Sequence, residues 1–276
     1  MIDLHTHTTA SDGGCSPEEL VTRAAAAGVT VLSVTDHDTV AGHAQAAAAC
    51  RAAGIALVPG IEITAVADEV DVHVLGYFFD TTAPSLSDFL TAQRAQRADR
   101  IRQIVRRLAT FGIVLDTESI LKPALDDPSR SPGRPWIARA LVAGGHAADV
   151  SDAFERWLSR DRPAFVPRPG ASPAEVFQRI HDAGGIASLA HPVHLKRQEH
   201  IREFANAGLD ALEVYHADHD VDATARYLAL ARELGLAISG GSDFHDDERH
   251  GGGGPGSVSL PGTEFDRLTA RHRGRA

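Results

Sequence analysis

The chain has 276 residues, of which 43% are hydrophobic and 23% charged, so it can bury a sizeable core in one domain with an insertion. The formal net charge of −10 provides no overall basic field, so we expect no stable binding of duplex nucleic acid and no membrane partner. No apolar run approaches the ~18 residues of a spanning helix, and the only cysteines, Cys15 and Cys50, fit a reduced, cytoplasmic compartment.

Strands and helices are expected to alternate over the first 80 residues. Residues 1–5 resemble a short strand. The Ser16-Pro17 pair, followed by two glutamates, predicts a capped helix N-terminus, and Gly28 suits the end of that helix. Further strands are expected at 29–34, 55–58 and 70–79, with an alanine-rich helix ending near Gly54.

The same unit returns late in the chain, where Ser172-Pro173 predicts another helix start and strands are expected at 186–190, 211–215 and 236–239. About seven strands with helical connections predict an α/β fold with parallel pairing. Gly251 begins a stretch expected to be flexible and exposed.

Residues 81–168 interrupt this rhythm and are expected to form a helical insertion, so the barrel would comprise residues 1–80 and 169–276. A long helix is predicted from Leu86 to Phe111, with shorter helices near 134–144 and 151–159. The long helix carries many arginines between 94 and 107, which we interpret as a solvated face.

Side chains that bind metals recur at or near the ends of the predicted strands. These are His5, His7, Asp36, His37, Glu62, His73, His191, His216, Asp243 and His245. Because the carboxyl ends of parallel barrel strands meet on one face, we expect a single cluster. Imidazole and carboxylate ligands suit divalent Mn, Zn or Fe. Nine of the candidates, Asp12 included, exceed the needs of one ion, so two or three ions are expected, with Mn²⁺ preferred over Zn²⁺ or Fe²⁺. These nine are His5, His7, His37, His73, His191 and His245 with Asp12, Glu62 and Asp243.

This set of motifs resembles the polymerase and histidinol phosphatase (PHP) family of metal-dependent phosphoesterases. The matching segments are Asp3-Leu4-His5-Thr6-His7, Ser11-Asp12-Gly13, Thr35-Asp36-His37, Gly60-Ile61-Glu62, His73-Val74-Leu75-Gly76, Ala190-His191-Pro192 and Ser242-Asp243-Phe244-His245. The resemblance implies a distorted (β/α)7 TIM-like barrel with an α-helical insertion and a site for three ions. It implies that the first ion is held by His5, His7, Glu62 and Asp243, the second by Glu62, His73 and His191, and the third by Asp12, His37 and His245.

The insertion resembles that of small bacterial PHP enzymes that act on nucleotides. The substrates implied are 3′,5′-bisphosphonucleotides or short 5′-phosphorylated oligonucleotides, hydrolysed by in-line attack of a metal-bound hydroxide without a side-chain nucleophile. We expect Arg134 and Arg160 to grip a second phosphate, because guanidinium binds phosphate oxygens bidentately. His194 and His216 are candidate substrate contacts.

Several alternatives remain open. Asp36 and Asp38 could orient imidazoles, although helix capping suits Asp38 equally well. His216 could lie in a solvated loop, and His73 could face solvent. A histidinol-phosphate phosphatase would share the metal site but would need acidic residues in the insertion, and a nucleotide- or metal-sensing module would lack turnover. The sequence predicts no particular oligomeric state.

Overall fold

The computed structural model describes residues 1–246 and 253–275. The stretch expected to be exposed from Gly251 onwards therefore lies partly outside the described residues. Within the described part of the chain, no helix is long and apolar enough to cross a membrane.

Seven strands form one sheet that follows the chain order from β1 to β7, counted over the described ranges. They are β1 (Ile2–Asp3), β2 (Val31–Val34), β3 (Ala56–Ala67), β4 (Val70–Tyr77), β5 (Ile186–Leu189), β6 (Ala211–Tyr215) and β7 (Ala237–Gly240). The Leu4 amide donates to the Gly240 carbonyl at 3.2 Å, and the His7 amide donates to Phe244 at 2.8 Å, so the chain after β1 approaches the chain after β7. The expected barrel is therefore nearly closed.

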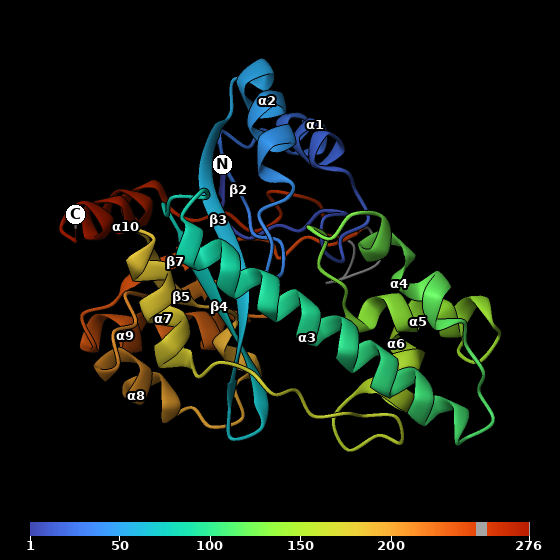
Figure 1. The fold of residues 1–276 in the computed structure, drawn as a ribbon. Helices are drawn as coiled ribbons and strands as arrows, with labels where there is room; N and C mark the ends of the chain where they lie inside the picture. Colours follow the sequence, from blue (N-terminus) through green and yellow to red (C-terminus); the bar gives the residue numbers. More distant parts are fainter. Residues whose placement is uncertain (247–252, 276) are drawn as a thin grey trace.

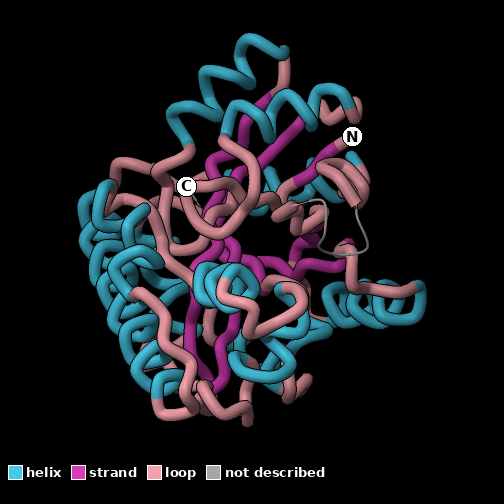
Figure 2. Tube along the Cα trace, turned by 90° about the vertical axis from the view of Figure 1, so that its right-hand side faces the viewer, coloured by secondary structure: helices cyan, strands magenta, loops and turns pink. Residues whose placement is uncertain are grey.

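The helices surround the sheet and also form the separate group at the right of Figure 1. They are α1 (Pro17–Ala26), α2 (His43–Ala53), α3 (Pro84–Ala109), α4 (Thr117–Asp126), α5 (Arg134–Ala143), α6 (Val150–Ala153), α7 (Pro173–Asp182), α8 (His200–Asn206), α9 (Val221–Glu233) and α10 (Gly262–Arg273), with a π-helix at Phe154–Leu158 and a 3-10 turn at Pro192–His194. The turned view of Figure 2 shows helices packed along the outside of the strands.

The predicted caps are present. The Ser16 hydroxyl accepts the Glu19 amide at 3.1 Å, and the Ser172 hydroxyl accepts the Glu175 amide at 3.3 Å. Each serine satisfies one of the amides that a helix N-terminus leaves without an intrahelical partner. Helix α4, which contains Pro123, was not predicted.

The expectation of parallel pairing throughout is wrong for β4. This strand runs antiparallel to both β3 and β5, with Glu62 opposite Leu75 and Thr64 opposite His73. The β3–β4 connection is a tight turn in which Asp68 and Glu69 both have positive φ, at 48° and 61°. Such a turn matches the twist of a hairpin and leaves no room for a crossover helix. Glu62 and His73 consequently lie within long strands and not at strand ends.

The insertion has an apolar cluster of its own. Buried side chains between Ile101 and Ala164, among them Ile137 and Leu141, pack together as a group distinct from the barrel core. Helix α3 connects the two groups, because Leu86 and Leu90 belong to the barrel core while Ile101 belongs to the insertion. Domain boundaries at 81 and 168 remain a prediction compatible with this packing.

Asp210 is expected to contribute to stability through its charge. Its buried carboxylate accepts the Ala187 amide at 3.0 Å and lies 2.7 Å from both His181 Nε2 and Arg275 Nε. Burial raises the pKa of Asp210, but hydrogen bonds from His181 and Ala187 outweigh it and hold the pKa below its ordinary value. Asp210→Asn should lower the free energy of unfolding at pH 7 by roughly 1–3 kcal/mol.

The lowered pKa of Asp210 also predicts how its contribution to stability changes with pH. A depressed folded-state pKa stabilises the protein above the unfolded pKa of Asp, and this contribution is lost as the pH falls through the folded-state value. Urea unfolding of wild type and Asp210→Asn from pH 7 to pH 3 should show a difference that shrinks towards acid. A difference that grows towards acid would contradict the prediction, and Glu233→Gln on the exposed face of α9 is the control.

Candidate metal centre

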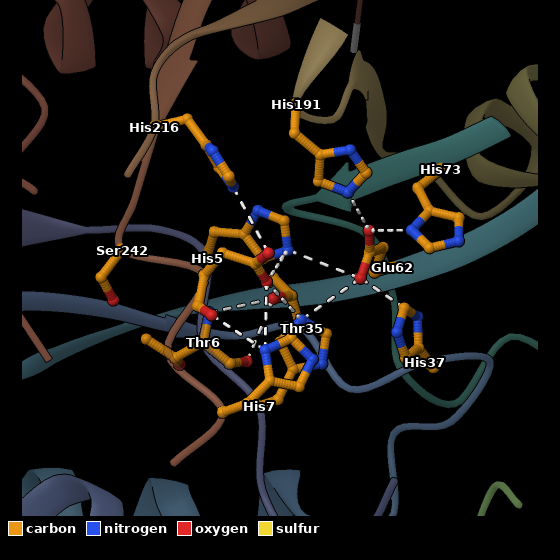
Figure 3. A network of polar contacts seen from close by, with 12 residues as sticks. His5, Thr6, His7, Thr35, His37, Glu62, His73, His191, His216 and Ser242 are labelled. Atoms are coloured by element: carbon orange, nitrogen blue, oxygen red, sulfur yellow. Dashed lines mark hydrogen bonds and ion pairs between the residues drawn. The ribbon is translucent and has the colours of Figure 1, made fainter. Parts of the chain in front are cut away.

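The carboxylate of Glu62 lies at the centre of the predicted ligand set, on β3 (Figure 3). It is 1% exposed, and imidazoles approach both of its oxygens. Its Oε1 lies 2.8 Å from His73 Nδ1 and 3.1 Å from His191 Nε2. Its Oε2 lies 3.5 Å from His5 Nε2, 3.2 Å from His7 Nε2 and 3.1 Å from His37 Nδ1. A carboxylate in this position can bridge two ions through its two oxygens.

The first group of candidate ligands combines the N-terminal segment with the end of β7. His5 Nε2 and His7 Nε2 both lie 3.1 Å from Asp243 Oδ1, and their rings are 5.2 Å apart. One ligand atom from each of His5, His7, Glu62 and Asp243 lies within 4.8 Å of the others. The structure thus brings together the four residues expected around the first ion.

The second group lies on the other side of Glu62. His73 comes from β4 and His191 follows β5, and their rings are 5.1 Å apart. His37 also lies near, with its ring 5.0 Å from that of His73. Because β4 is antiparallel to β3, the imidazole of His73 reaches Glu62 from within its strand.

The third group surrounds Asp12. Its Oδ1 lies 3.4 Å from His245 Nε2 and 3.9 Å from both His7 Nδ1 and His37 Nε2. His7 therefore belongs to two groups, because its two ring nitrogens face different carboxylates. The resemblance assigned His7 to the first group alone, and the structure adds this second contact.

Asp36 and Asp38, predicted to orient imidazoles, have other partners. Asp36 accepts the amide and hydroxyl of Thr8 at 2.8 and 2.6 Å and the hydroxyl of Ser11 at 2.6 Å, which orders the loop before Asp12. Asp38 accepts the Thr64 amide at 3.1 Å and pairs with two arginines. These partners are backbone amides, hydroxyls and guanidinium groups, so the two carboxylates support the site through its loops and its arginines.

The electrostatics of the site follow from burial and charge. Burial by itself lowers the pKa of His7, but the nearby carboxylates of Asp243 and Glu62 outweigh burial and raise the pKa to about 10. His37 has the opposite balance, since burial dominates and holds its pKa well below the ordinary value. Burial raises the pKa of Glu62, yet the surrounding histidines lower it further and keep the carboxylate ionised.

The donor set fits divalent ions. Within the described ranges, His5 Nε2, both ring nitrogens of His7 and His37 Nδ1 are buried without a hydrogen-bond partner. Buried polar atoms normally have a partner, so these nitrogens need a ligand that the protein does not provide. A cation among imidazole nitrogens and carboxylate oxygens satisfies them, and this donor set suits Mn, Zn or Fe.

Four arginines line a cavity of about 240 Å³ beside the metal candidates Asp12, His37 and His73. They are Arg97, Arg100, Arg134 and Arg168. The expectation of a solvated arginine face on α3 is therefore wrong for Arg97 and Arg100. Their side chains are only 11% and 9% exposed, and they share a side of the helix with buried Ile101 and Ile104. Arg97 pairs with the carboxylate of Asp38, and Arg100 pairs with that of Asp71.

 

The residues predicted to contact substrate do not all lie in this cavity. Arg134 faces the cavity, 3.6 Å from Asp71 Oδ2 and 5.7 Å from the Phe154 ring. Arg160 lies beside the β3–β4 turn, where it donates to the Glu69 carbonyl at 2.7 Å, so the two predicted arginines do not share this cavity. His194 is exposed and lines a neighbouring cavity with His73 and His191.

His216 is placed differently from its prediction as a substrate contact or a solvated loop residue. It is 3% exposed, and its Nε2 lies 3.3 Å from Asp243 Oδ2. Glu213, which the sequence analysis did not single out, is fully buried behind His5. A glutamate inside the apolar run Ala211–Tyr215 was the available signal, because a buried charge needs a partner.

A nearly closed barrel with a buried cluster of imidazoles and carboxylates at one end defines a metal-dependent hydrolase. The PHP domain family matches residues 3–131. The chain is 36% identical to the 5′-3′ exoribonuclease Rnm of Escherichia coli, over 89% of this chain and 85% of the relative. It is 34% identical to the 3′,5′-nucleoside bisphosphate phosphatase of Chromobacterium violaceum, over 88% and 87%. The chain belongs to the PHP family of metal-dependent phosphoesterases.

Solved structures agree with this assignment. A protein of Bifidobacterium adolescentis that is described as a metal-dependent phosphoesterase superposes with a TM-score of 0.89 at 32% identity, over 98% of this chain and 95% of that one. A Chromobacterium violaceum amidohydrolase with bound sulfate superposes with a TM-score of 0.87 at 32% identity, over 98% and 96%. The predicted fold class, a distorted TIM-like barrel, and the predicted enzyme class, a phosphoric ester hydrolase, are confirmed.

Proposed function

We propose that this phosphoesterase uses Mn²⁺ and removes phosphate from 3′,5′-bisphosphonucleotides, cleaves short 5′-phosphorylated oligonucleotides from the 5′ end, or does both. Relatives named for each activity match the chain over most of its length, which supports either substrate. The observation that carries the proposal is the arginine-lined cavity directly beside the candidate ligands His37 and His73. A substrate with two phosphates can place one at the ions and the other among the arginines.

The nine predicted ligands would hold the ions in three groups that share Glu62 and His7. Divalent ions bound there lower the pKa of water and neutralise the charge of a phosphoryl group. The chain itself supplies the buried, partly enclosed site, and Asp36 orders the loop that carries Asp12. We propose no side-chain nucleophile, because the groups nearest the cluster are imidazoles and carboxylates suited to metal binding.

The arginine cavity is the part of the site suited to a second phosphate. Arg97 and Arg168 share the carboxylate of Asp38, and Arg100 and Arg134 share that of Asp71. Four guanidinium groups thus face two carboxylates, which leaves the cavity positive. The Nε of Arg168 is buried without a hydrogen-bond partner among the described residues, so it can donate to an anion.

This charge balance argues against the histidinol-phosphate alternative. An aminated substrate would place its cation among these guanidinium groups, where like charges repel. The sensing-module alternative predicts bound metal without turnover. A phosphate-release assay with added Mn²⁺ should compare adenosine 3′,5′-bisphosphate, a 5′-phosphorylated dinucleotide and histidinol phosphate. Release from either nucleotide substrate, with little from histidinol phosphate, is expected; metal binding without release from any of the three would overturn the proposal.

Arg134→Ala is expected to weaken the use of nucleotide substrates selectively. The variant removes one guanidinium from the cavity, and loss of a charged hydrogen bond predicts a fall in kcat/KM of about 10- to 100-fold. Hydrolysis of p-nitrophenyl phosphate, which has no second phosphate, should change little. Steady-state kinetics on both substrates check this, with the exposed Arg202→Ala as control. An equal loss on both substrates would assign Arg134 to the fold or the metal centre.

A further inference from the structure

Strand β6 supplies none of the nine predicted metal ligands, yet two side chains from its end contact three of them. Glu213 lies on the strand and His216 follows it directly. We propose that Glu213 and His216 are positioning residues that hold the predicted ligands His5, His191 and Asp243 in metal-binding geometry. The inference rests on the proposed metal centre, and it does not depend on the identity of the substrate.

Glu213 determines which nitrogen of His5 faces the site. Its Oε1 lies 2.9 Å from His5 Nδ1, and both residues are fully buried. A carboxylate can only accept, so this contact places the ring proton on Nδ1. The Nε2 lone pair then faces Glu62 and Asp243, at 3.5 and 3.1 Å from their nearest oxygens. Carboxylates that fix a histidine in this way also raise its basicity as a ligand.

The second oxygen of Glu213 holds the backbone of another predicted ligand. Oε2 accepts the amide of His191 at 2.6 Å. His191 has φ at 25°, a conformation that is costly for a residue with a Cβ atom. The hydrogen bond stabilises this conformation, which aims the His191 ring at Glu62, 3.1 Å away. One buried carboxylate therefore supports ligands from both sides of Glu62.

His216 orients the carboxylate of Asp243. Its Nδ1 accepts the Asp218 amide at 3.0 Å, which places the ring proton on Nε2. That Nε2 lies 3.3 Å from Asp243 Oδ2, so it can donate to this oxygen. The other oxygen, Oδ1, faces His5 and His7 at 3.1 Å each. Figure 3 shows His216 reaching the cluster from the side opposite His37 and His73.

Glu213 and His216 could instead bind a further ion together with His5, because ligand atoms of these three residues lie within 4.8 Å of one another. The hydrogen bonds favour positioning. Each oxygen of Glu213 already faces an N–H group, from His5 and from His191. A cation placed there would compete with those protons and release the two ligands that Glu213 supports.

Glu213→Gln tests the role of the carboxylate with minimal change in shape. A glutamine has one acceptor oxygen and one NH₂ donor, so either His5 or His191 would face a donor. We expect the Mn²⁺ concentration for half-saturation to rise about 10- to 100-fold, with unchanged stoichiometry at saturation. Equilibrium dialysis with elemental analysis measures both quantities, and circular dichroism of the metal-free protein verifies folding. Glu233→Gln, an exposed glutamate of α9, is the matched control.

His216 provides an independent pair of variants. His216→Gln keeps an N–H donor that can reach Asp243, whereas His216→Phe keeps a planar ring without a donor. We expect near wild-type Mn²⁺ half-saturation for the glutamine variant and weaker binding, again about 10-fold or more, for the phenylalanine variant. This rescue by the conservative variant separates positioning from simple packing, because phenylalanine preserves packing better than glutamine does.

The outcomes distinguish this inference from the proposed function. Wild-type protein that binds no Mn²⁺ would overturn the metal centre itself. Wild-type binding with unchanged half-saturation in both Glu213→Gln and His216→Phe would overturn the positioning role alone. A loss of one ion per chain at saturation in Glu213→Gln would show that Glu213 is a ligand, which also overturns it. If Glu213→Gln does not fold, the comparison of the two His216 variants decides.

Discussion

Glu62→Gln is expected to remove metal from the centre and to lower phosphoesterase activity by at least ~1,000-fold. The reason is the position of its carboxylate, whose two oxygens face five imidazoles from four segments of the chain. A glutamine has a similar shape, but it is neutral and can accept through one oxygen only. Ions on both sides of residue 62 therefore lose a charged ligand at once.

The measurement is metal content per chain after dialysis against a fixed Mn²⁺ concentration, together with phosphate release from adenosine 3′,5′-bisphosphate. Metal content should fall by more than one ion if Glu62 bridges two of them. Glu175→Gln, in the exposed first turn of α7, should retain both metal and activity. Full metal content in a folded Glu62→Gln protein would be incompatible with a bridging role.

Asp12→Ala and His7→Ala should have different effects on metal content. Asp12 contacts the group that contains His37 and His245, whereas His7 faces Asp12 with one ring nitrogen and both Glu62 and Asp243 with the other. Asp12→Ala should therefore lose one ion, and His7→Ala should weaken the binding of two. We expect activity to fall on the order of 100-fold or more in each variant.

Titrations of the two variants with Mn²⁺, followed by elemental analysis, check this prediction. His43→Ala is unsuitable as a control because its ring bonds to the carbonyls of two strands, so the half-buried His146→Ala in the insertion is preferable. Identical stoichiometries for Asp12→Ala and His7→Ala would contradict the division into groups that share His7.

Much of the local structure could be predicted because it depends on neighbours in sequence. Ser16 and Ser172 cap their helices through amides three residues ahead, and Gly28 takes the positive φ of 81° that ends a helix easily. The same holds for the order of the strands, since apolar runs and their spacing are visible in the sequence. The grouping of His5, His7 and Asp243 was implied by the resemblance to the PHP family, and the three side chains do lie together.

Other features depend on contacts that no local pattern contains. The antiparallel direction of β4 follows from a turn at Asp68 and Glu69, neither of which is the glycine or asparagine that usually indicates positive φ. The arginine-rich pattern of α3 predicted solvent-facing side chains, whereas Arg97 and Arg100 pair with the carboxylates of Asp38 and Asp71. In the sequence, only their spacing of four residues from Ile101 and Ile104 indicates that Arg97 and Arg100 share the buried face of the helix.

The sequence by itself thus determined the family, the barrel and the residue types around a metal centre, because ligand chemistry and strand ends are written in short motifs. Only the tertiary structure decided that His7 faces two groups, that Arg134 and not Arg160 lines the arginine cavity, and that Glu213 stands behind His5. Each of these contacts joins residues far apart in the chain, and it depends on the direction in which their side chains point. Such directions are established only when the barrel closes and the insertion packs against it.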